Sequence, residues 1–121
     1  MNQADKDKIA DIARHYNLAL VVLFGSRARG DGRDTSDYDV AYSSLHPINF
    51  SEENLMAVEF HSLFKTTNVD IVNLQNARPL LLKKIVDEGI PIYEARESIF
   101  NSLYLYATRI FRESKNLNNL R

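Results

Sequence analysis

Two aspartates separated by one residue, Asp37 and Asp39, begin a run of apolar and aromatic residues that is typical of a β-strand. Side chains two positions apart on a strand point to the same face of the sheet, so these carboxylates lie side by side. Neighbouring carboxylates repel each other unless a cation lies between them, and carboxylate oxygens are the ligands that Mg²⁺ prefers. The pair therefore predicts a magnesium site.

A third acid, Asp70, lies inside the apolar run of residues 69–74. A lone carboxylate is costly to bury in such a strand, so it needs a partner or a place at the surface. If this strand lies beside the one that begins at Asp37, Asp70 becomes a third carboxylate of the same site. Three carboxylates can hold two metal ions about 4 Å apart, the arrangement that serves in-line phosphoryl displacement. An exposed acid on an edge strand is the alternative for Asp70 taken alone.

Gly25 and Ser26 directly follow the apolar run of residues 18–24. A glycine at the end of a strand lets the chain turn sharply and lets a ligand approach the main chain. The backbone N–H groups of the turn that follows, together with the Ser26 hydroxyl, then form a seat for phosphate oxygens. Positive charge for these phosphates is available from three arginines, without an indication of which one faces the site: Arg27, Arg29 and Arg33.

Length and composition restrict the class of protein. The 121 residues fit one domain over 1–121, and the fractions of apolar (45%) and charged (26%) residues are those of a globular protein. The net charge of −1 gives no overall positive field for a long nucleic acid, so we do not expect direct nucleic-acid binding. The absence of cysteine excludes thiolate catalysis and cysteine zinc sites. A polar start and no long apolar run indicate a cytoplasmic protein without a membrane segment.

The elements that must position the acidic residues alternate in type. Helical spacing of apolar residues predicts helices over 3–16, 79–88 and 97–116, and a short turn of helix over 26–29. A further helix is predicted to begin after an N-cap at Ser51. Short apolar runs predict strands over 18–24, 37–43, 69–74 and 90–93. This order implies an α+β fold, with a mixed sheet of three to four strands and helices packed on it.

Aromatic residues fall into two groups. Tyr38 and Tyr42 alternate with the aspartates and lie on the opposite face of the strand, which favours core packing over base stacking. The last helix has an apolar arc of roughly 160°, which its own sheet can bury for the most part. Leu105 falls outside that arc, and with Tyr104 and Phe111 it indicates a surface for a partner. Lys83 and Lys84 are interpreted as the solvated face of the helix over 79–88.

The complete pattern is Gly25-Ser26, ten residues, and then Asp37-Tyr38-Asp39. It resembles the Gly-Ser-x10-Asp-x-Asp signature of the polymerase-β-like nucleotidyltransferase superfamily. The longer pattern over 25–30 and 36–39 resembles the minimal nucleotidyltransferase (MNT) branch in particular, and the resemblance covers nearly the whole chain. It implies the nucleotidyltransferase fold.

The resemblance also implies roles for the residues of the motif. The metal ligands and catalytic residues are Asp37, Asp39 and Asp70, the last of which helps to position or activate the acceptor hydroxyl. The nucleotide-binding residues are Gly25 and Ser26, to which we add Arg27. The implied reaction is attack of an acceptor oxygen on the α-phosphate of ATP with release of pyrophosphate, assisted by a pair of Mg²⁺ ions.

Many MNT proteins are the antitoxin of a HEPN-domain ribonuclease, and they adenylylate a tyrosine of that toxin. Larger relatives that modify aminoglycosides have an added helical domain that helps to bind the drug, and 121 residues leave no room for one. We therefore predict an ATP-dependent protein adenylyltransferase whose partner is a cognate HEPN toxin. Two alternatives stay open: an antitoxin that blocks its toxin sterically without catalysis, and a nucleotidyltransferase that acts on a small molecule or an RNA end.

Overall fold

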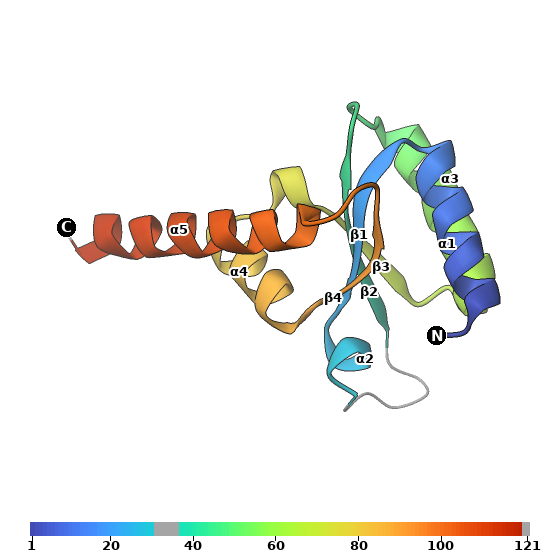
Figure 1. Cartoon of the computed structure of the whole chain (residues 1–121), viewed down its shortest axis with the longest axis horizontal. Helices are drawn as coiled ribbons and strands as arrows, with labels where there is room; N and C mark the ends of the chain where they lie inside the picture. Colours follow the sequence, from blue (N-terminus) through green and yellow to red (C-terminus); the bar gives the residue numbers. More distant parts are fainter. Residues whose placement is uncertain (31–36, 120–121) are drawn as a thin grey trace.

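The computed structural model describes residues 1–30 and 37–119, and within them four strands form one mixed sheet (Figure 1). The strands are β1 (Leu18–Phe24), β2 (Tyr38–Ser44), β3 (Val69–Asn73) and β4 (Ile90–Glu94), in the spatial order β3-β2-β1-β4. β1 is antiparallel to both β2 and β4, whereas β2 and β3 are parallel. The predicted α+β fold with a mixed sheet is confirmed, and the predicted strands are found within one residue at each end.

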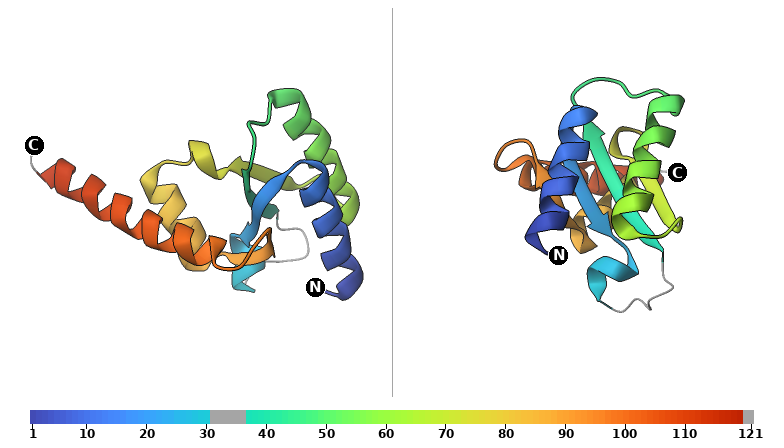
Figure 2. Two further views of the ribbon diagram at one scale, coloured as in Figure 1. Left: turned by 45° about the horizontal axis from the view of Figure 1, so that its top comes forward. Right: turned by 90° about the vertical axis from the view of Figure 1, so that its right-hand side faces the viewer.

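Helices cover both faces of the sheet, as Figures 1 and 2 show. One face is covered by α1 (Gln3–His15) and α3 (Phe50–Phe64), and the other by α4 (Pro79–Glu88) and α5 (Ile99–Asn119). Two short elements follow strands: α2 (Ser26–Arg29) after β1, and the 3-10 helix η1 (Leu74–Asn76) after β3. The sheet therefore has two differently covered faces, which we call the α1/α3 face and the α4/α5 face.

Each face has its own apolar core, because alternate residues of β1 and β2 point in opposite directions. The core of the α1/α3 face is formed by Ile12, Ala13, Leu18, Val21, Val40, Tyr42, Met56 and Phe60. The core of the α4/α5 face is formed by Leu20, Val22, Phe24, Ala41, Leu74, Leu82, Ile85, Val86 and Ala107. Central strands buried on both sides are the reason why residues 18–24 have no polar alternation.

The N-cap predicted at Ser51 is wrong. The α3 helix begins at Phe50, and the Asn49 side chain accepts a hydrogen bond from the Glu52 N–H at 2.8 Å. The Glu52 carboxylate in turn accepts one from the Asn49 N–H at 3.3 Å, which completes a capping box. This reciprocal pair satisfies two free N–H groups, whereas a cap at Ser51 would satisfy one.

The last helix starts and ends later than predicted. Ser98 has a left-handed φ of 72°, which interrupts the helical backbone before Ile99. The Glu94 carboxylate at the end of β4 then accepts a hydrogen bond from the Phe100 N–H at 2.9 Å, which stabilises the first turn of α5. α5 lies along α4 and extends beyond it (Figure 1). Within the described residues, none of the helices combines the length and the apolar character of a membrane span.

Candidate active site

The predicted site residues meet at one end of the sheet, where β1 ends and β2 and β3 begin. Phe24 at the end of β1 pairs with Asp39 in β2, so Gly25 leaves the sheet beside the first residues of β2. Asp39 pairs with Asp70 on the neighbouring parallel strand. The Tyr38 N–H donates to the Asn68 carbonyl at 2.8 Å, which fixes this register. The condition under which Asp70 could join the site, that β3 lies beside β2, is therefore met.

Strand alternation puts the acids and the tyrosines on opposite faces. Asp39 and Asp70 share the α4/α5 face with Ala41, which is part of that core. Tyr42 is fully buried in the core of the α1/α3 face, and the Tyr38 ring stacks on Phe64 of α3 with centroids 4.1 Å apart. The predicted core packing is confirmed for Tyr42, whereas Tyr38 is half-buried and stacks on Phe64 outside the core.

Asp39 is the acid whose ionisation the surroundings oppose. Its carboxyl is half-buried, whereas Asp37 and Asp70 are exposed. Burial raises the pKa of Asp39 above its ordinary value of 3.8, and the negative charges of Asp70 and then Asp37 raise it further. The charges of Lys84 and Arg29 act in the opposite direction on the same pKa. Asp39 therefore lies at the centre of a cluster of acids that repel one another.

Gly25 brings the main chain against this cluster. Gly25 is buried, has a φ of +77° and a ψ of −159°, and a Cβ atom at this position would overlap the Asp39 carboxylate. That backbone conformation is essentially restricted to glycine. The Gly25 carbonyl then accepts hydrogen bonds from the N–H groups of Ala28 and Arg29 at 3.1 Å, which starts α2 with Ser26 as its first residue. The sharp turn predicted after the first strand is present and lies beside Asp39.

Arg27 contacts Tyr38, the residue between Asp37 and Asp39. Its guanidinium lies over the Tyr38 ring, 4.3 Å from the centroid, and Tyr38 packs against α3 on the α1/α3 face. A guanidinium over an aromatic face is held by a cation–π interaction. The nucleotide-binding role of Arg27 stays a prediction, and the side chain would have to act from the side of β2 opposite to Asp39. Arg33 and Gly32 lie outside the described residues.

Two further cations reach the site from elements that the motif does not include. Arg29, the last residue of α2, pairs with Glu88 at the end of α4 at 2.9 Å. Lys84 lies one turn earlier on α4, is exposed, and still acts on Asp39 through its charge. Helical periodicity identifies Lys84 and Glu88 as neighbours on α4, but the sequence contains no signal for which strand that side of the helix meets.

The donor set of the acids fits a hard divalent cation. Asp37, Asp39 and Asp70 offer carboxylate oxygens, the ligand type of Mg²⁺, and a bound cation would relieve the repulsion that raises the pKa of Asp39. Among residues 1–30 and 37–119, no three acidic or histidine side chains converge as a preformed metal cluster. The observation that supports an ion is therefore the mutual repulsion of the acids and their strand register.

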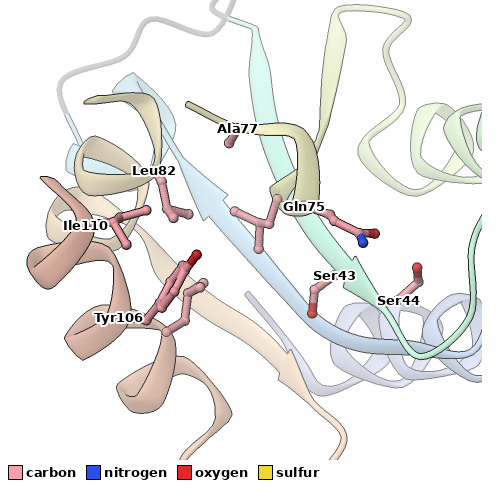
Figure 3. Close-up of a pocket in the computed structure, with 9 residues that line it drawn as sticks. Ser43, Ser44, Gln75, Ala77, Leu82, Tyr106 and Ile110 are labelled. Carbon is pink, nitrogen blue, oxygen red and sulfur yellow. The ribbon is translucent and has the colours of Figure 1, made fainter. Parts of the chain in front are cut away.

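A cavity of about 380 Å³ lies at the other end of the α4/α5 face (Figure 3). Its polar rim includes Ser43, Ser44 and Gln75, while Leu82 and Ile110 line its apolar side. Asp39 and Ser43 are four residues apart on β2, which corresponds to about 13 Å along the strand. The cavity is therefore separate from the acids, and the candidate active site lies at the end of the sheet where β1 ends and β2 begins.

The fold is similar to that of several solved structures. A crystal structure of a toxin–antitoxin with AMP-PNP matches with a TM-score of 0.81 at 20% identity, over 95% of this chain and 93% of that chain. A tri-AMPylated Shewanella oneidensis HEPN toxin in complex with MNT antitoxin matches with a TM-score of 0.77 at 20% identity, over 99% and 94%. The toxin–antitoxin MntA-HepT matches with a TM-score of 0.76 at 19% identity, over 98% and 94%. At these identities the likeness establishes the fold.

The protein family of the chain follows from its sequence. No curated protein matches the chain. The family model described as polymerase beta, nucleotidyltransferase, matches residues 7–98, which include the turn at Gly25 and all three acids of the site. Because this match covers most of the chain and the fold agrees with it, the chain belongs to the polymerase β nucleotidyltransferase family.

Proposed function

We propose that this chain is the antitoxin of a toxin–antitoxin pair, a Mg²⁺-dependent enzyme that transfers AMP from ATP to a tyrosine of a cognate HEPN ribonuclease. The observation that carries the proposal is the register of β2 and β3, which pairs Asp39 with Asp70 beside the main chain of Gly25. The acids and the turn after Gly25 lie at the same end of the sheet, which supports a site for metal and phosphates. The membership of the nucleotidyltransferase family supports the reaction type.

The proposed roles of the site residues are of two kinds, metal binding and phosphate binding. Asp37, Asp39 and Asp70 would hold the magnesium ions, of which we propose two. When bound, Mg²⁺ neutralises the charge on the reacting phosphate oxygens and polarises the α-phosphate. The N–H groups of the turn after Gly25, with the Ser26 hydroxyl, would bind the triphosphate, and Arg27 would add positive charge.

The reaction is a single displacement at phosphorus. The acceptor phenol oxygen forms a bond to the α-phosphorus of ATP, and the bond from that phosphorus to the oxygen of the β-phosphate breaks, so that pyrophosphate leaves. The phenol proton passes to the Asp70 carboxylate. Positioning and charge neutralisation account for most of the catalysis in such transfers, which agrees with a site made of carboxylates, backbone and cations.

The similar structures support a protein acceptor. One contains a toxin–antitoxin with AMP-PNP, and another contains a tri-AMPylated HEPN toxin with MNT antitoxin. The chain spans more than nine tenths of the matched chains, at 93% and 94%. A site at the end of the sheet, rather than in a closed cavity, also suits an acceptor side chain that belongs to a second protein.

The exposed side of α5 is our proposed contact surface for that toxin. Leu105 is 63% exposed and Tyr104 is 38% exposed, while Phe111 is half-buried. Exchange of Leu105 for Asp should weaken the complex by about tenfold or more, because an interface anchor of this kind contributes at least 1–2 kcal/mol. The measurement is titration calorimetry with the toxin, and Leu45→Asp, at an equally exposed leucine (62%) of the loop after β2, is the matched control.

The experiment that tests the function is intact mass spectrometry of a co-expressed toxin. The wild-type chain should add one or more AMP groups to the toxin, and Asp37→Ala/Asp39→Ala should add none. Asp11→Ala, which removes an exposed acid of α1 far from the motif, is the control that should behave as wild type. An unmodified toxin in an intact complex with the wild-type chain would favour steric inhibition, and transfer to RNA or a small molecule would favour a different acceptor.

A further inference from the structure

The basic side chains of α2 and α4 differ in what holds them. Arg27 lies over the Tyr38 ring, and Arg29 pairs with Glu88 at 2.9 Å. Lys83 donates to both carboxylate oxygens of Asp87 at 2.6 and 2.7 Å. Among the described residues, Lys84 has neither a hydrogen bond nor a salt bridge. Its charge is therefore the one on these two helices that the rest of the described chain leaves available for a ligand.

The packing of α4 determines which side of the helix, with Lys84 on it, lies toward the acids. The helix is anchored by Leu82, Ile85 and Val86, which are buried in the core of the α4/α5 face. Glu88 lies four residues after Lys84, hence on the same side of the helix, and its pair with Arg29 ties that side to α2. Lys84 thus lies on the side of α4 that faces the turn after Gly25, and its charge reaches the Asp39 carboxylate.

There is space beside this lysine for a ligand. A hollow of about 460 Å³ is bordered by α4 and by Phe111 of α5, and the residues of α4 that line it are Leu80, Lys83, Lys84, Asp87 and Glu88. The hollow borders Lys84 and Glu88, on the side of α4 that the pair between Glu88 and Arg29 ties to α2. A triphosphate carries several negative charges, and a lysine ammonium is a compact point charge suited to phosphate oxygens.

We propose that Lys84 binds the phosphate chain of the nucleotide beyond the α-phosphate and stabilises the departing pyrophosphate. This inference rests on the proposed nucleotidyltransferase activity and adds a residue from outside the Gly-Ser and Asp-x-Asp motif. The ammonium donates hydrogen bonds to the phosphate oxygens and forms no covalent bond. Lys84 is therefore a nucleotide-binding residue that distinguishes a triphosphate from a monophosphate.

The test is equilibrium binding of Mg²⁺ with AMP-PNP, ADP or AMP to the full chain. Lys84→Ala should weaken AMP-PNP binding by about ten- to a hundredfold, the usual effect of a lost charge-assisted hydrogen bond, and leave AMP binding unchanged. Lys84→Arg should recover most of the affinity, because it restores the charge. Lys8→Ala is the matched control, since it removes an exposed lysine of α1 on the opposite face of the sheet, and it should bind AMP-PNP as the wild type does.

Each result has a distinct meaning. Equal AMP-PNP affinity of Lys84→Ala and wild type would overturn the role of Lys84 and leave the proposed function standing. An equal loss for AMP and AMP-PNP would also overturn it, because the lysine would then act through Asp39 or through the fold. A wild-type chain that fails to bind AMP-PNP with an excess of either Mg²⁺ or Mn²⁺ would contradict the proposed function itself.

Discussion

The two faces of the sheet differ in how their polar side chains are matched. On the α1/α3 face, the Tyr42 hydroxyl donates to the Glu53 carboxylate at 2.5 Å, and burial with a hydrogen bond to Glu59 raises the pKa of Tyr16 to about 12. On the α4/α5 face, Asp39 pairs in register with Asp70 of the neighbouring strand, and burial together with the charge of that acid raises the pKa of Asp39. One face pairs the phenols of Tyr16 and Tyr42 with acids, while the other has neighbouring acids.

This difference shows how a single strand can serve both stability and function. Along β2, Tyr38 and Tyr42 point to the face where side chains satisfy one another, and Asp39 points to the face where they do not. Groups that repel each other in a folded protein need a ligand to explain their placement. Substitutions on the two faces should therefore have opposite signatures: lost transfer with unchanged stability on one, and lost stability with unchanged transfer on the other.

The largest effect is expected for the acids. Asp39→Asn or Asp70→Asn should lower the rate of AMP transfer by about a hundred- to a thousandfold, in the range found when one preorganised electrostatic group is removed from a catalytic site. The free energy of unfolding without metal should not fall, because the exchange removes a repulsion. Single-turnover labelling of the toxin and thermal unfolding measure the two quantities. Transfer by Asp39→Asn at nearly the wild-type rate would contradict the contrast between the faces.

Two glycines with similar backbones provide the next comparison. Gly25 and Gly30 have φ values of +77° and +80°, but a Cβ at Gly25 would overlap the Asp39 carboxylate, whereas one at Gly30 would meet no described atom within 4 Å. Gly30→Ala should cost about 1–2 kcal/mol from its left-handed backbone alone, with transfer retained. Gly25→Ala should cost more, roughly 3 kcal/mol, and abolish transfer, because strain and overlap add.

Urea denaturation and toxin labelling on the two glycine variants test this pair. Equal losses of stability, or transfer retained by Gly25→Ala, would show that the close approach of Gly25 to Asp39 has no role.

A smaller effect is expected on the α1/α3 face. Tyr42→Phe removes the hydrogen bond to Glu53 and leaves that carboxylate without its donor, which should lower the free energy of unfolding by about 1–2 kcal/mol. The rate of transfer per folded molecule should be that of the wild type, because Tyr42 points away from Asp39. Urea denaturation gives the first quantity, and labelling at low temperature gives the second. A large loss of transfer with little loss of stability would reverse the assignment of the faces.

Strong local patterns were enough to predict most of the elements. The apolar run of β1 and the proline and glycine that bound α4 predicted those elements with the bounds that the structure has. The N-cap at Ser51 was wrong because Asn49 and Glu52 form a reciprocal pair, which a single polar residue cannot match. The start of α5 depends on Glu94, which lies in another element and is not part of the helix pattern.

The site was predictable only in the part that the chain makes locally. Gly25 and Asp39 are identified by their spacing, but the pairing of Asp39 with Asp70 requires the order of the strands, which spacing does not determine. Lys84 is exposed, as predicted, but its charge also acts on Asp39, and helical periodicity does not say which strand a helix side meets. The contact of Arg27 with Tyr38 likewise depends on packing between α2, β2 and α3.

The smallest effect, and the most direct test of the repulsion, is the pH dependence of stability without metal. The pKa of Asp39 is higher in the folded chain than its ordinary value of 3.8, so protonation of this acid favours the folded state. That contribution is complete below pH 3.8 and is lost as the pH rises through the raised pKa of the folded state. Asp39→Asn lacks it, so the stability of the wild type relative to this variant should fall over that window.

Thermal unfolding of both proteins in a chelating buffer measures this difference. Since Asp39 is half-exposed, solvent screens the repulsion and the change should be smaller than that of Tyr42→Phe. Added Mg²⁺ should stabilise the wild type at neutral pH and have little effect on Asp39→Asn. Parallel pH profiles for the two proteins would mean that the acids do not repel one another, and the α4/α5 face would then lose the property that separates it from the α1/α3 face.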